Sequence, residues 1–323
     1  MTFCVIFILI MRYFLTFCLV LSSLISFSQS SNFNSGKNWK LNRKELIIQA
    51  GATQFLGDLG GRDQIGTDYS LVDLNFPSTS FDVGVGYRYR FAPHFATTSL
   101  LNIGLLKGSD ALTNDSDRHA RNLSFRSPVV NLSQRLEWLI FVNEKYGKRY
   151  NMKGMKGFGE HHDQVYVFAG IGFAYFNPQA QYNGNWVNLR PLKTEGQGLE
   201  GGAKVYLPFT ATIPIGIGYR RALAGMWRIG IEATYVKTFS DYIDDVHGFY
   251  YDPTILATQV SATSAALSNP SVTHPEWFNP GSKRGEPQKD AYFYVNLTFY
   301  KNFSYKPMKK MRISRYKGGR AKF

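Results

Sequence analysis

The sequence predicts an all-β protein: an eight-stranded antiparallel transmembrane β-barrel with long extracellular loops and a basic C-terminal periplasmic tail. Three observations lead to this fold class. The N-terminus resembles an export signal, several segments alternate apolar and polar residues with the period of a strand, and the spacers alternate between short and long. We expect four parts: residues 1–28 (signal peptide), 29–44 (periplasmic segment), 45–304 (barrel) and 305–323 (tail).

The N-terminal segment has the composition of a secretory signal peptide. The stretch MRYFLTFCLVLSSLISFSQS carries one basic residue, Arg12, followed by an apolar run and small residues, and cleavage is expected after Ser28. The alternative is an uncleaved anchor over residues 3–27. Both cysteines, Cys4 and Cys18, lie in this segment, so the cleaved chain has no disulfide, thiolate zinc site or cysteine nucleophile.

Eight strand-like segments follow, each about ten residues long and bounded by turn residues. The second, FDVGVGYRYRF, alternates without interruption: Val83 and Val85 lie on one side of an extended chain, and Asp82, Arg88 and Arg90 lie on the other. The fourth, seventh and eighth segments likewise have one apolar and one polar face. In order, the eight segments are residues 45–57, 81–91, 94–106, 129–141, 164–176, 212–222, 226–239 and 290–303.

The spacers alternate in length, as they do in outer-membrane barrels. Little more than Ala92-Pro93 joins the second and third segments, and residues 223–225 join the sixth and seventh. The connections after the first, third, fifth and seventh segments are long, the last covering about residues 240–288. Residues 143–163 form an exception, because this connection at the short-turn end is long and basic.

The polar faces of the strands are predicted to line the barrel interior. A soluble lipocalin-like barrel would place the apolar faces inside instead. Export without disulfides and aromatic residues near strand ends favour a membrane barrel, in which an arginine facing mid-bilayer would cost roughly 2–4 kcal/mol. The interior arginines then need partners, and three carboxylates are available, so we expect a filled lumen without an open pore. The predicted lumen charge network comprises Asp82, Arg88, Arg90, Arg135, Glu137, Arg220, Arg228 and Glu232.

The sequence offers no strong pattern for a catalytic, cofactor or metal site, and we expect none. His161-His162 is adjacent, so on a strand the two side chains point in opposite directions. His119 and His247 lie in acidic loops, which is a weak signal for a hydrolase. Three carboxylates between residues 241 and 245 could bind a divalent cation, but a solvated loop or a cap for the barrel mouth is favoured; they are Asp241, Asp244 and Asp245.

The last long loop is expected to be ordered in two pieces. GFYYDP (residues 248–253) and WFNPGSKRGEP (residues 277–287) combine aromatic residues with proline and glycine, which is typical of ordered loops and binding surfaces. The stretch ATQVSATSAALS, residues 257–268, is instead expected to be disordered.

The C-terminal tail holds much of the formal net charge of +14, with eight Lys or Arg and no acid in residues 305–323. It is either a solvated tail that touches anionic headgroups or a docking segment for a periplasmic partner. Nucleic acid is excluded as a partner because the compartment is wrong. The predicted partner-binding residues are Lys306, Lys309, Lys310, Arg312, Arg315, Lys317, Arg320 and Lys322.

Five phrases of the chain form a recognisable set. The most specific are TFSDYIDDVHGFYYDP (residues 238–253) and WFNPGSKRG (residues 277–285); RNLSFRSPVVNLSQRLEW (121–138), FAGIGFAYFNPQAQ (168–181) and LRPLKTEGQGL (189–199) add to them. Together they resemble the PorG-type outer-membrane protein of the type IX secretion system. The resemblance covers nearly all of the chain after the signal segment.

The strand count, the spacer lengths and the signal peptide predict that both termini lie in the periplasm. The resemblance implies a non-enzymatic secretion component in the outer membrane. The expected partners are outer-membrane lipids and a periplasmic ring of a PorK/GldK-type lipoprotein and a PorN/GldN-type protein. This ring serves export of proteins with a C-terminal signal, and gliding motility where it occurs. The family supplies no catalytic residues. The alternative function is a small barrel acting through its outer loops as an adhesin or a lipid-modifying enzyme.

Overall fold

The computed structural model describes residues 39–40, 43–59, 76–112, 115–144, 162–224, 227–286 and 288–303. All of them belong to one compact unit, Lys37–Phe323. The predicted signal peptide, the basic part of the connection after the fourth strand (residues 145–161) and the predicted tail lie outside the described residues.

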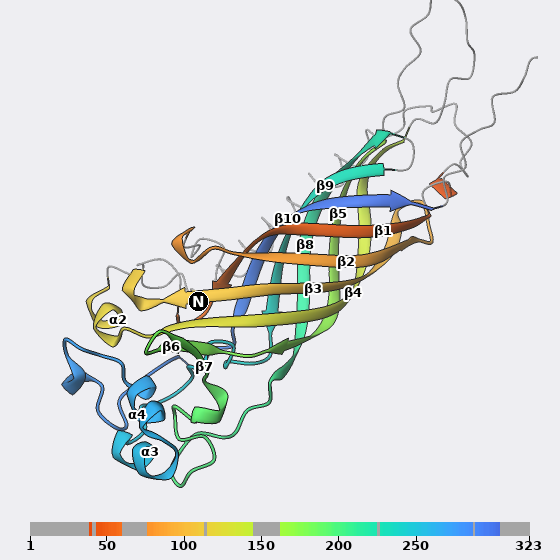
Figure 1. The fold of residues 1–323 in the computed structure, drawn as a ribbon. Helices are drawn as coiled ribbons and strands as arrows, with labels where there is room; N and C mark the ends of the chain where they lie inside the picture. Colours follow the sequence, from red (N-terminus) through yellow and green to blue (C-terminus); the bar gives the residue numbers. More distant parts are fainter. Residues whose placement is uncertain are drawn as a thin grey trace, which may run out of the picture. The chain divides into compact units, whose positions relative to one another are not determined.

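Eight antiparallel strands close into a barrel, which confirms the predicted fold class (Figure 1). Their order is β3-β2-β1-β10-β9-β8-β5-β4, and pairing between β3 and β4 closes the ring. No helix in the described part of the chain is long and apolar enough to cross a membrane. The strands are β1 (Lys44–Leu56), β2 (Ser80–Arg90), β3 (Phe95–Ser109), β4 (Ser124–Glu144), β5 (His162–Phe176), β8 (Phe209–Ala224), β9 (Trp227–Thr238) and β10 (Ala291–Asn302).

The two ends of the barrel differ. At one end, called the turn end, residues 91–94 join β2 to β3 and residues 225–226 join β8 to β9. The long connections after β1, β3, β5 and β9 meet at the opposite end, called the loop end. Because Glu45 of β1 pairs with Asn302 of β10, the chain enters and leaves the barrel at the turn end.

The barrel is apolar outside and polar inside. On β2, Val83 and Val85 are about half exposed, at 49% and 48%, whereas Asp82 and Arg88 are buried. The same alternation continues on β9, where Ile231 is exposed and Glu232 is buried. A barrel in water would have the reverse arrangement, so the lipocalin-like alternative is wrong and the outer surface is suited to lipid.

An arginine on this outer surface is expected to be costly. Val85 lies in the middle of β2, between Ile48 of β1 and Leu101 of β3. Replacing Val85 with arginine should lower the free energy of unfolding in lipid vesicles by roughly 2–4 kcal/mol, because the guanidinium would meet the hydrocarbon. Urea titration measures this, with Val85→Leu as the apolar control. Equal stability of the two variants would mean that this face does not contact lipid.

The β3 and β4 strands extend beyond their neighbours at the loop end and carry an additional hairpin. Their pairing runs to Ser109 and Ser124, so β4 begins five residues before the predicted segment. A short hairpin, β6 (Gln179–Tyr182) and β7 (Asn185–Asn188), attaches to β4. Its turn is Asn183-Gly184, with φ of 51° and 80°, an arrangement that Asn-Gly favours in two-residue hairpins.

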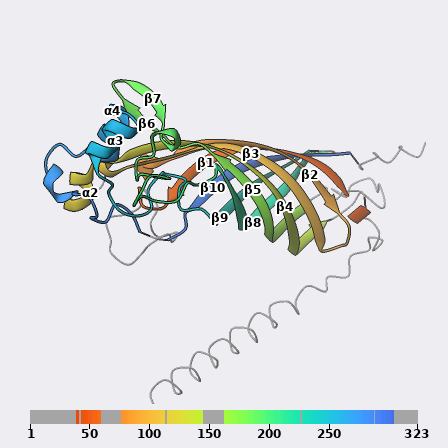
Figure 2. The ribbon, with the colours of Figure 1, turned by 90° about the horizontal axis from the view of Figure 1, so that it is seen from below.

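The remaining helices lie at the loop end. Figures 1 and 2 show α2 (Ser116–Arg121), α3 (Pro253–Gln259) and α4 (Ala262–Ser268) gathered there with the β6–β7 hairpin. In the described part of the chain, 3-10 turns accompany the longer elements at η3 (Phe76–Ser78), η4 (Asp110–Leu112), η5 (Arg190–Leu192) and η6 (Pro275–Trp277).

The expectation of disorder over residues 257–268 is wrong. This stretch forms the end of α3 and all of α4, with Asp252 and Ser261 as their N-caps. The helices persist because each buries a leucine, Leu256 and Leu267, against the rest of the loop end.

The expected order on either side of that stretch is confirmed. Residues 248–253 pair with the loop at residues 281–285, where Phe249 forms a bridge with Lys283 and Tyr250 N–H donates to the Ser282 carbonyl at 2.9 Å. The two phrases that carry the sequence resemblance most specifically therefore meet in one structure.

Candidate functional site

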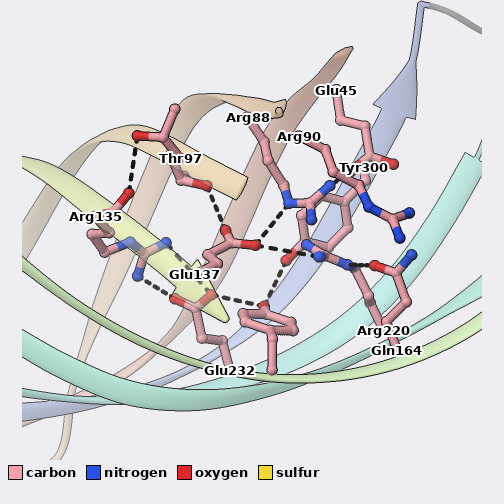
Figure 3. A network of polar contacts seen from close by, with 12 residues as sticks. Glu45, Arg88, Arg90, Thr97, Arg135, Glu137, Gln164, Arg220, Glu232 and Tyr300 are labelled. Carbon is pink, nitrogen blue, oxygen red and sulfur yellow. Dashed lines mark hydrogen bonds and ion pairs between the residues drawn. The ribbon is translucent and has the colours of Figure 1, made fainter. Parts of the chain in front are cut away.

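Glu137 of β4 is the centre of a buried ion network inside the barrel (Figure 3). Its Oε2 accepts a hydrogen bond from Arg88 Nε of β2 at 2.7 Å and one from Arg220 Nη2 of β8 at 3.2 Å. Its other oxygen accepts from the Thr98 hydroxyl of β3. The Glu137 carboxylate therefore links β4 to β2, β3 and β8.

Two further carboxylates extend the network around the barrel. Glu45 of β1 binds Arg88 Nη1 at 2.8 Å and lies 3.3 Å from Arg228 Nη1. Glu232 of β9 accepts from Arg135 Nη1 at 2.5 Å. Each of these side chains is almost fully buried, so removing one charge would leave a partner with fewer or no opposite charges in the lumen.

Aromatic rings fill the space between the charges. The Tyr166 hydroxyl donates to Glu232 at 2.9 Å and lies 2.9 Å from the Tyr300 hydroxyl. The Arg220 guanidinium lies over the Tyr166 ring, 4.4 Å from its centroid, and Arg135 lies 4.2 Å from the centroid of Phe168. These side chains occupy the interior of the barrel, as expected for eight strands.

The structure places all eight predicted lumen residues on the inner face, but it does not bring them all together. Asp82 is not an arginine partner: it accepts hydrogen bonds from Asn102 at 2.8 Å and Asn296 at 2.9 Å. The cause is its position along the barrel, since Arg88 lies six residues further along β2, about 20 Å away. Arg90 donates from Nε to the Pro93 carbonyl at 3.2 Å in the β2–β3 turn.

Sequence reasoning missed the roles of Glu45, Gln164 and Tyr166. Glu45 lies on the same inner face of β1 as the apolar Ile47. Because this face mixes polar and apolar residues, the sequence does not mark it as the polar face. Gln164 accepts from Arg220 Nε at 2.6 Å. The strand register decides which residue lies opposite each of them on the neighbouring strand. The register cannot be read from the alternation within one segment.

A second polar cluster closes the loop end. We call it the loop-end cap: Thr194, Glu195, Tyr206, Asp241, Asp244, Asp245, His247, Arg284 and Asp290. Arg284 is buried at its centre, and its Nη1 donates to Glu195 Oε1 at 2.9 Å and to the Asp245 carbonyl at 2.7 Å. The Asp245 carboxylate accepts from Thr194 Oγ1 at 2.6 Å and from the Tyr206 hydroxyl at 2.5 Å.

The three carboxylates between residues 241 and 245 are not solvated. Asp244 accepts from the backbone N–H of Leu59 at 3.2 Å and of Val246 at 3.0 Å, and Asp241 contacts His247 Nδ1. Their neighbours Ile243 and Val246 join an apolar cluster with interior residues of the barrel. The solvated-loop interpretation is therefore wrong, and this segment caps the barrel mouth.

Burial raises the pKa of several carboxyls in the cap. The pKa of Asp244 and of Asp290 stands well above the usual range because both are desolvated and lie near other carboxylates. Desolvation also raises the pKa of Asp241 and of Asp245 to about 6, although Arg284 opposes the shift at Asp245.

These shifts predict a cap that is more stable in acid. A carboxyl whose folded pKa exceeds its ordinary value of 3.8 binds a proton more tightly in the folded state, so the stabilisation is lost as pH rises through about 6. Hydrogen exchange over residues 241–250, corrected for its intrinsic pH dependence, should show about tenfold or more protection at about pH 5 relative to about pH 7.5.

Asp245→Asn is the matched control for this pH dependence. Asp245 has a φ of 65°, which asparagine tolerates, so the variant should keep the backbone and lose the part of the pH dependence that comes from Asp245, while Asp241 still titrates. An unchanged pH profile in the variant would assign the dependence to another group.

The cap has no arrangement that indicates catalysis. His247 and Asp241 form a pair, but no Ser or Thr hydroxyl hydrogen bonds to either side chain among the described residues. Over the same residues, no group of three His, Cys, Asp or Glu side chains could hold a metal ion. His119 lies on α2, whose Arg121 instead binds Asp110 at 2.7 Å and the Arg284 carbonyl at 2.7 Å.

No protein-family model and no curated protein matches the chain. Solved outer-membrane barrels resemble it at low identity. The Neisserial surface protein NspA is 6% identical, with 80% of this chain and 97% of that chain covered and a TM-score of 0.34. Ail, the attachment invasion locus protein of Yersinia pestis, is 9% identical over 80% and 98%, with a TM-score of 0.33. A major outer membrane protein of Thermus thermophilus is 12% identical over 80% and 99%, with a TM-score of 0.28.

The closed strand order and the outward apolar face of this chain define an outer-membrane barrel fold by themselves. In the described part of the chain, buried side chains occupy the lumen, as is typical of eight-stranded barrels.

Proposed function

We propose that this chain is the outer-membrane component of a type IX secretion machine that anchors the periplasmic ring of a PorK/GldK-type lipoprotein and a PorN/GldN-type protein. The observation that carries the proposal is the loop-end cap. The two phrases that most resemble the PorG-type family, residues 238–253 and 277–285, interlock there through Arg284 and the Phe249–Lys283 bridge.

The proposed orientation places the loop end outside the cell and the turn end in the periplasm. Long loops outside and short turns inside are the usual arrangement of outer-membrane barrels. Both chain ends leave the barrel at the turn end, so the basic residues 305–323 and the basic connection at residues 145–161 would face the periplasm together. A filled barrel with a basic periplasmic side is suited to anchoring rather than to conducting solute.

Truncation after Tyr305 is expected to leave the barrel inserted, because β10 ends at Asn302. Attachment to the ring should weaken, and the remaining attachment of the full chain should fall as salt rises. Each exposed charge pair contributes about 0–1 kcal/mol, so the eight cations act as a set rather than singly. Co-purification of the ring in mild detergent at two salt concentrations measures this.

A full-length variant with all eight tail cations changed to glutamine is the matched control, since it keeps the length and the apolar residues of the tail. Unchanged ring recovery in both variants would refute docking through the tail. If truncation abolished ring recovery but salt did not change the recovery with the full chain, the contact would be assigned to apolar residues such as Met308 and Ile313.

Deleting the gene separates this function from the alternative class. Loss of export of many proteins is expected for a secretion component. A change confined to lipid chemistry or adhesion would instead support an adhesin or a lipid-modifying enzyme.

A further inference from the structure

A cavity of 460 Å³ lies at the loop end, where the outer ends of β5 and β8 meet the connection between them. This volume is within the range of small-molecule sites, about 300–1,000 Å³. Tyr175 of β5 forms one wall, and Tyr206 forms another. The cavity is separate from the ion network of the lumen and borders the loop-end cap at Tyr206 and at Gln197, which is bonded to Glu195.

Two cations line this cavity, the exposed Arg190 and the half-buried Lys193. Arg190 begins η5 and Lys193 follows its last residue, so the turn holds both side chains at the same opening. Within the described part of the chain, neither side chain makes an ion pair or a hydrogen bond. This contrasts with the lumen and the cap, where the buried cations Arg88, Arg135 and Arg284 are paired with carboxylates. The free positive charge makes the cavity suited to an anion.

A buried amide group also borders the cavity. Gln197 is one of its lining residues and is 3% exposed, and its Oε1 accepts from Glu195 N–H at 3.2 Å. Its Nε2 has no hydrogen-bond partner among the described residues. Buried amide groups are rarely left unpaired, so this donor is available to an oxygen acceptor.

The walls are rigid and partly apolar. The Tyr206 ring stacks on Tyr242 with centroids 4.4 Å apart, and the Tyr206 hydroxyl is held by Asp245. Exposed Val205 lines the cavity beside Tyr175. Because Tyr175 is also in ring contact with Phe209 on the outer face of β8, at 5.3 Å, the cavity opens at the edge of the apolar barrel surface.

We propose that this cavity binds the phosphorylated headgroup of an outer-leaflet lipid. Arg190 and Lys193 neutralise the phosphate, and Gln197 Nε2 donates to one of its oxygens. The acyl chains extend along the exposed side chains below, Leu207 and Phe209, which are 70% and 58% exposed. The inference rests on the outward orientation of the loop end in the proposed function, and it is independent of ring docking.

The test compares lipids that differ only in phosphate. The purified full chain, in mild detergent, is given lipid A or its dephosphorylated form, and native mass spectrometry counts the bound lipid. The protein should retain lipid A in preference. Arg190→Gln with Lys193→Gln should reduce this retention on the order of tenfold or more, because each cation near a phosphate contributes to affinity. Gln197→Met, which keeps the side-chain length and removes the donor, should reduce it less.

Lys107→Gln with Lys204→Gln is the matched control. Both lysines are exposed, neither lines the cavity, and the pair removes the same charge. Heat-modifiable mobility on a gel confirms that every variant is folded. Equal retention by the cavity variant and the control would overturn the proposal, and so would equal retention of the dephosphorylated lipid.

Inorganic phosphate distinguishes the two sources of the anion. If it displaced lipid A at concentrations near those of the lipid, the cavity would be a site for a soluble anion and the lipid assignment would be wrong. Ring co-purification is measured separately, so a failed ring test with intact lipid retention would refute docking alone.

Discussion

Replacing Glu137 with glutamine is expected to destabilise the barrel by about 3–5 kcal/mol. The substitution keeps the size of the side chain and removes one negative charge from the centre of the lumen. Arg88 would keep Glu45 as a partner at 2.8 Å, whereas Arg220 would lose its ion-pair partner and keep Gln164 and the ring of Tyr166. A buried guanidinium that loses its ion-pair partner has little water around it to replace the lost interaction.

Urea unfolding of the barrel in lipid vesicles measures this effect. Glu286→Gln is the control, because its ion pair with Lys283 is exposed and is worth about 0–1 kcal/mol. A double variant, Glu137→Gln with Arg220→Met, should recover part of the loss, since the unpaired cation is removed as well. If Glu137→Gln were no more destabilising than Glu286→Gln, water would have to reach the lumen charges, and the interior would not be sealed.

The strands and their orientation could be predicted because each depends on local pattern. Alternation over residues 81–91 defines both faces of β2, and the transfer cost of an arginine in lipid decides which face is inside. The predicted bounds lie within three residues of the observed ones for every strand except β4, whose five additional residues at its start pair with the end of β3.

The partners inside the lumen could not be predicted in the same way. Asp82 has the right charge and the right face to pair with an arginine, yet its depth in the barrel gives it Asn102 and Asn296. Glu45 pairs with Arg88 because β1 and β2 are in register at those two residues. Depth and register follow from all eight strands together, and no single segment contains them.

The loop end was the least predictable part for a related reason. The stretch at residues 257–268 is rich in Ala, Ser and Thr and lacks a strong apolar period, but its helices are held by caps and by contacts with the loop between β5 and β8. Ser264 donates to the Leu192 carbonyl, and Ser268 donates to the Thr194 carbonyl at 2.6 Å. By contrast, the hairpin of β6 and β7 could have been predicted, because the Asn-Gly pair at residues 183–184 is a local pattern that favours a two-residue turn.

The lumen and the cap use the same solution for different purposes. In both, arginine and carboxylate side chains are buried together and paired. Removing one partner of such a pair lowers the free energy of unfolding strongly, because the other charge stays buried. In the lumen this holds the eight-stranded wall together. In the cap it ties loops from different parts of the chain, since Glu195, Asp245 and Arg284 come from separate segments.

Arg284→Met is expected to open the loop-end cap while leaving the barrel intact. Methionine keeps the apolar stem, but Glu195 and Asp245 would then be buried together without the cation that opposes their charge. The free energy of local opening should fall by about 3–5 kcal/mol. Hydrogen exchange over residues 241–250 should accelerate accordingly, whereas heat-modifiable mobility of the barrel should not change.

Lys283→Met is the matched control, because it makes a closely similar change at the adjacent residue. Lys283 is exposed and pairs with Glu286 at 2.7 Å on the surface, so its loss should change protection by about 0–1 kcal/mol. Loss of Arg284 should also steepen the pH dependence of the cap, since the pKa of Asp245 would rise further without the guanidinium. Equal exchange in the two variants would show that backbone pairing alone, including the Phe249–Lys283 bridge, holds the cap closed.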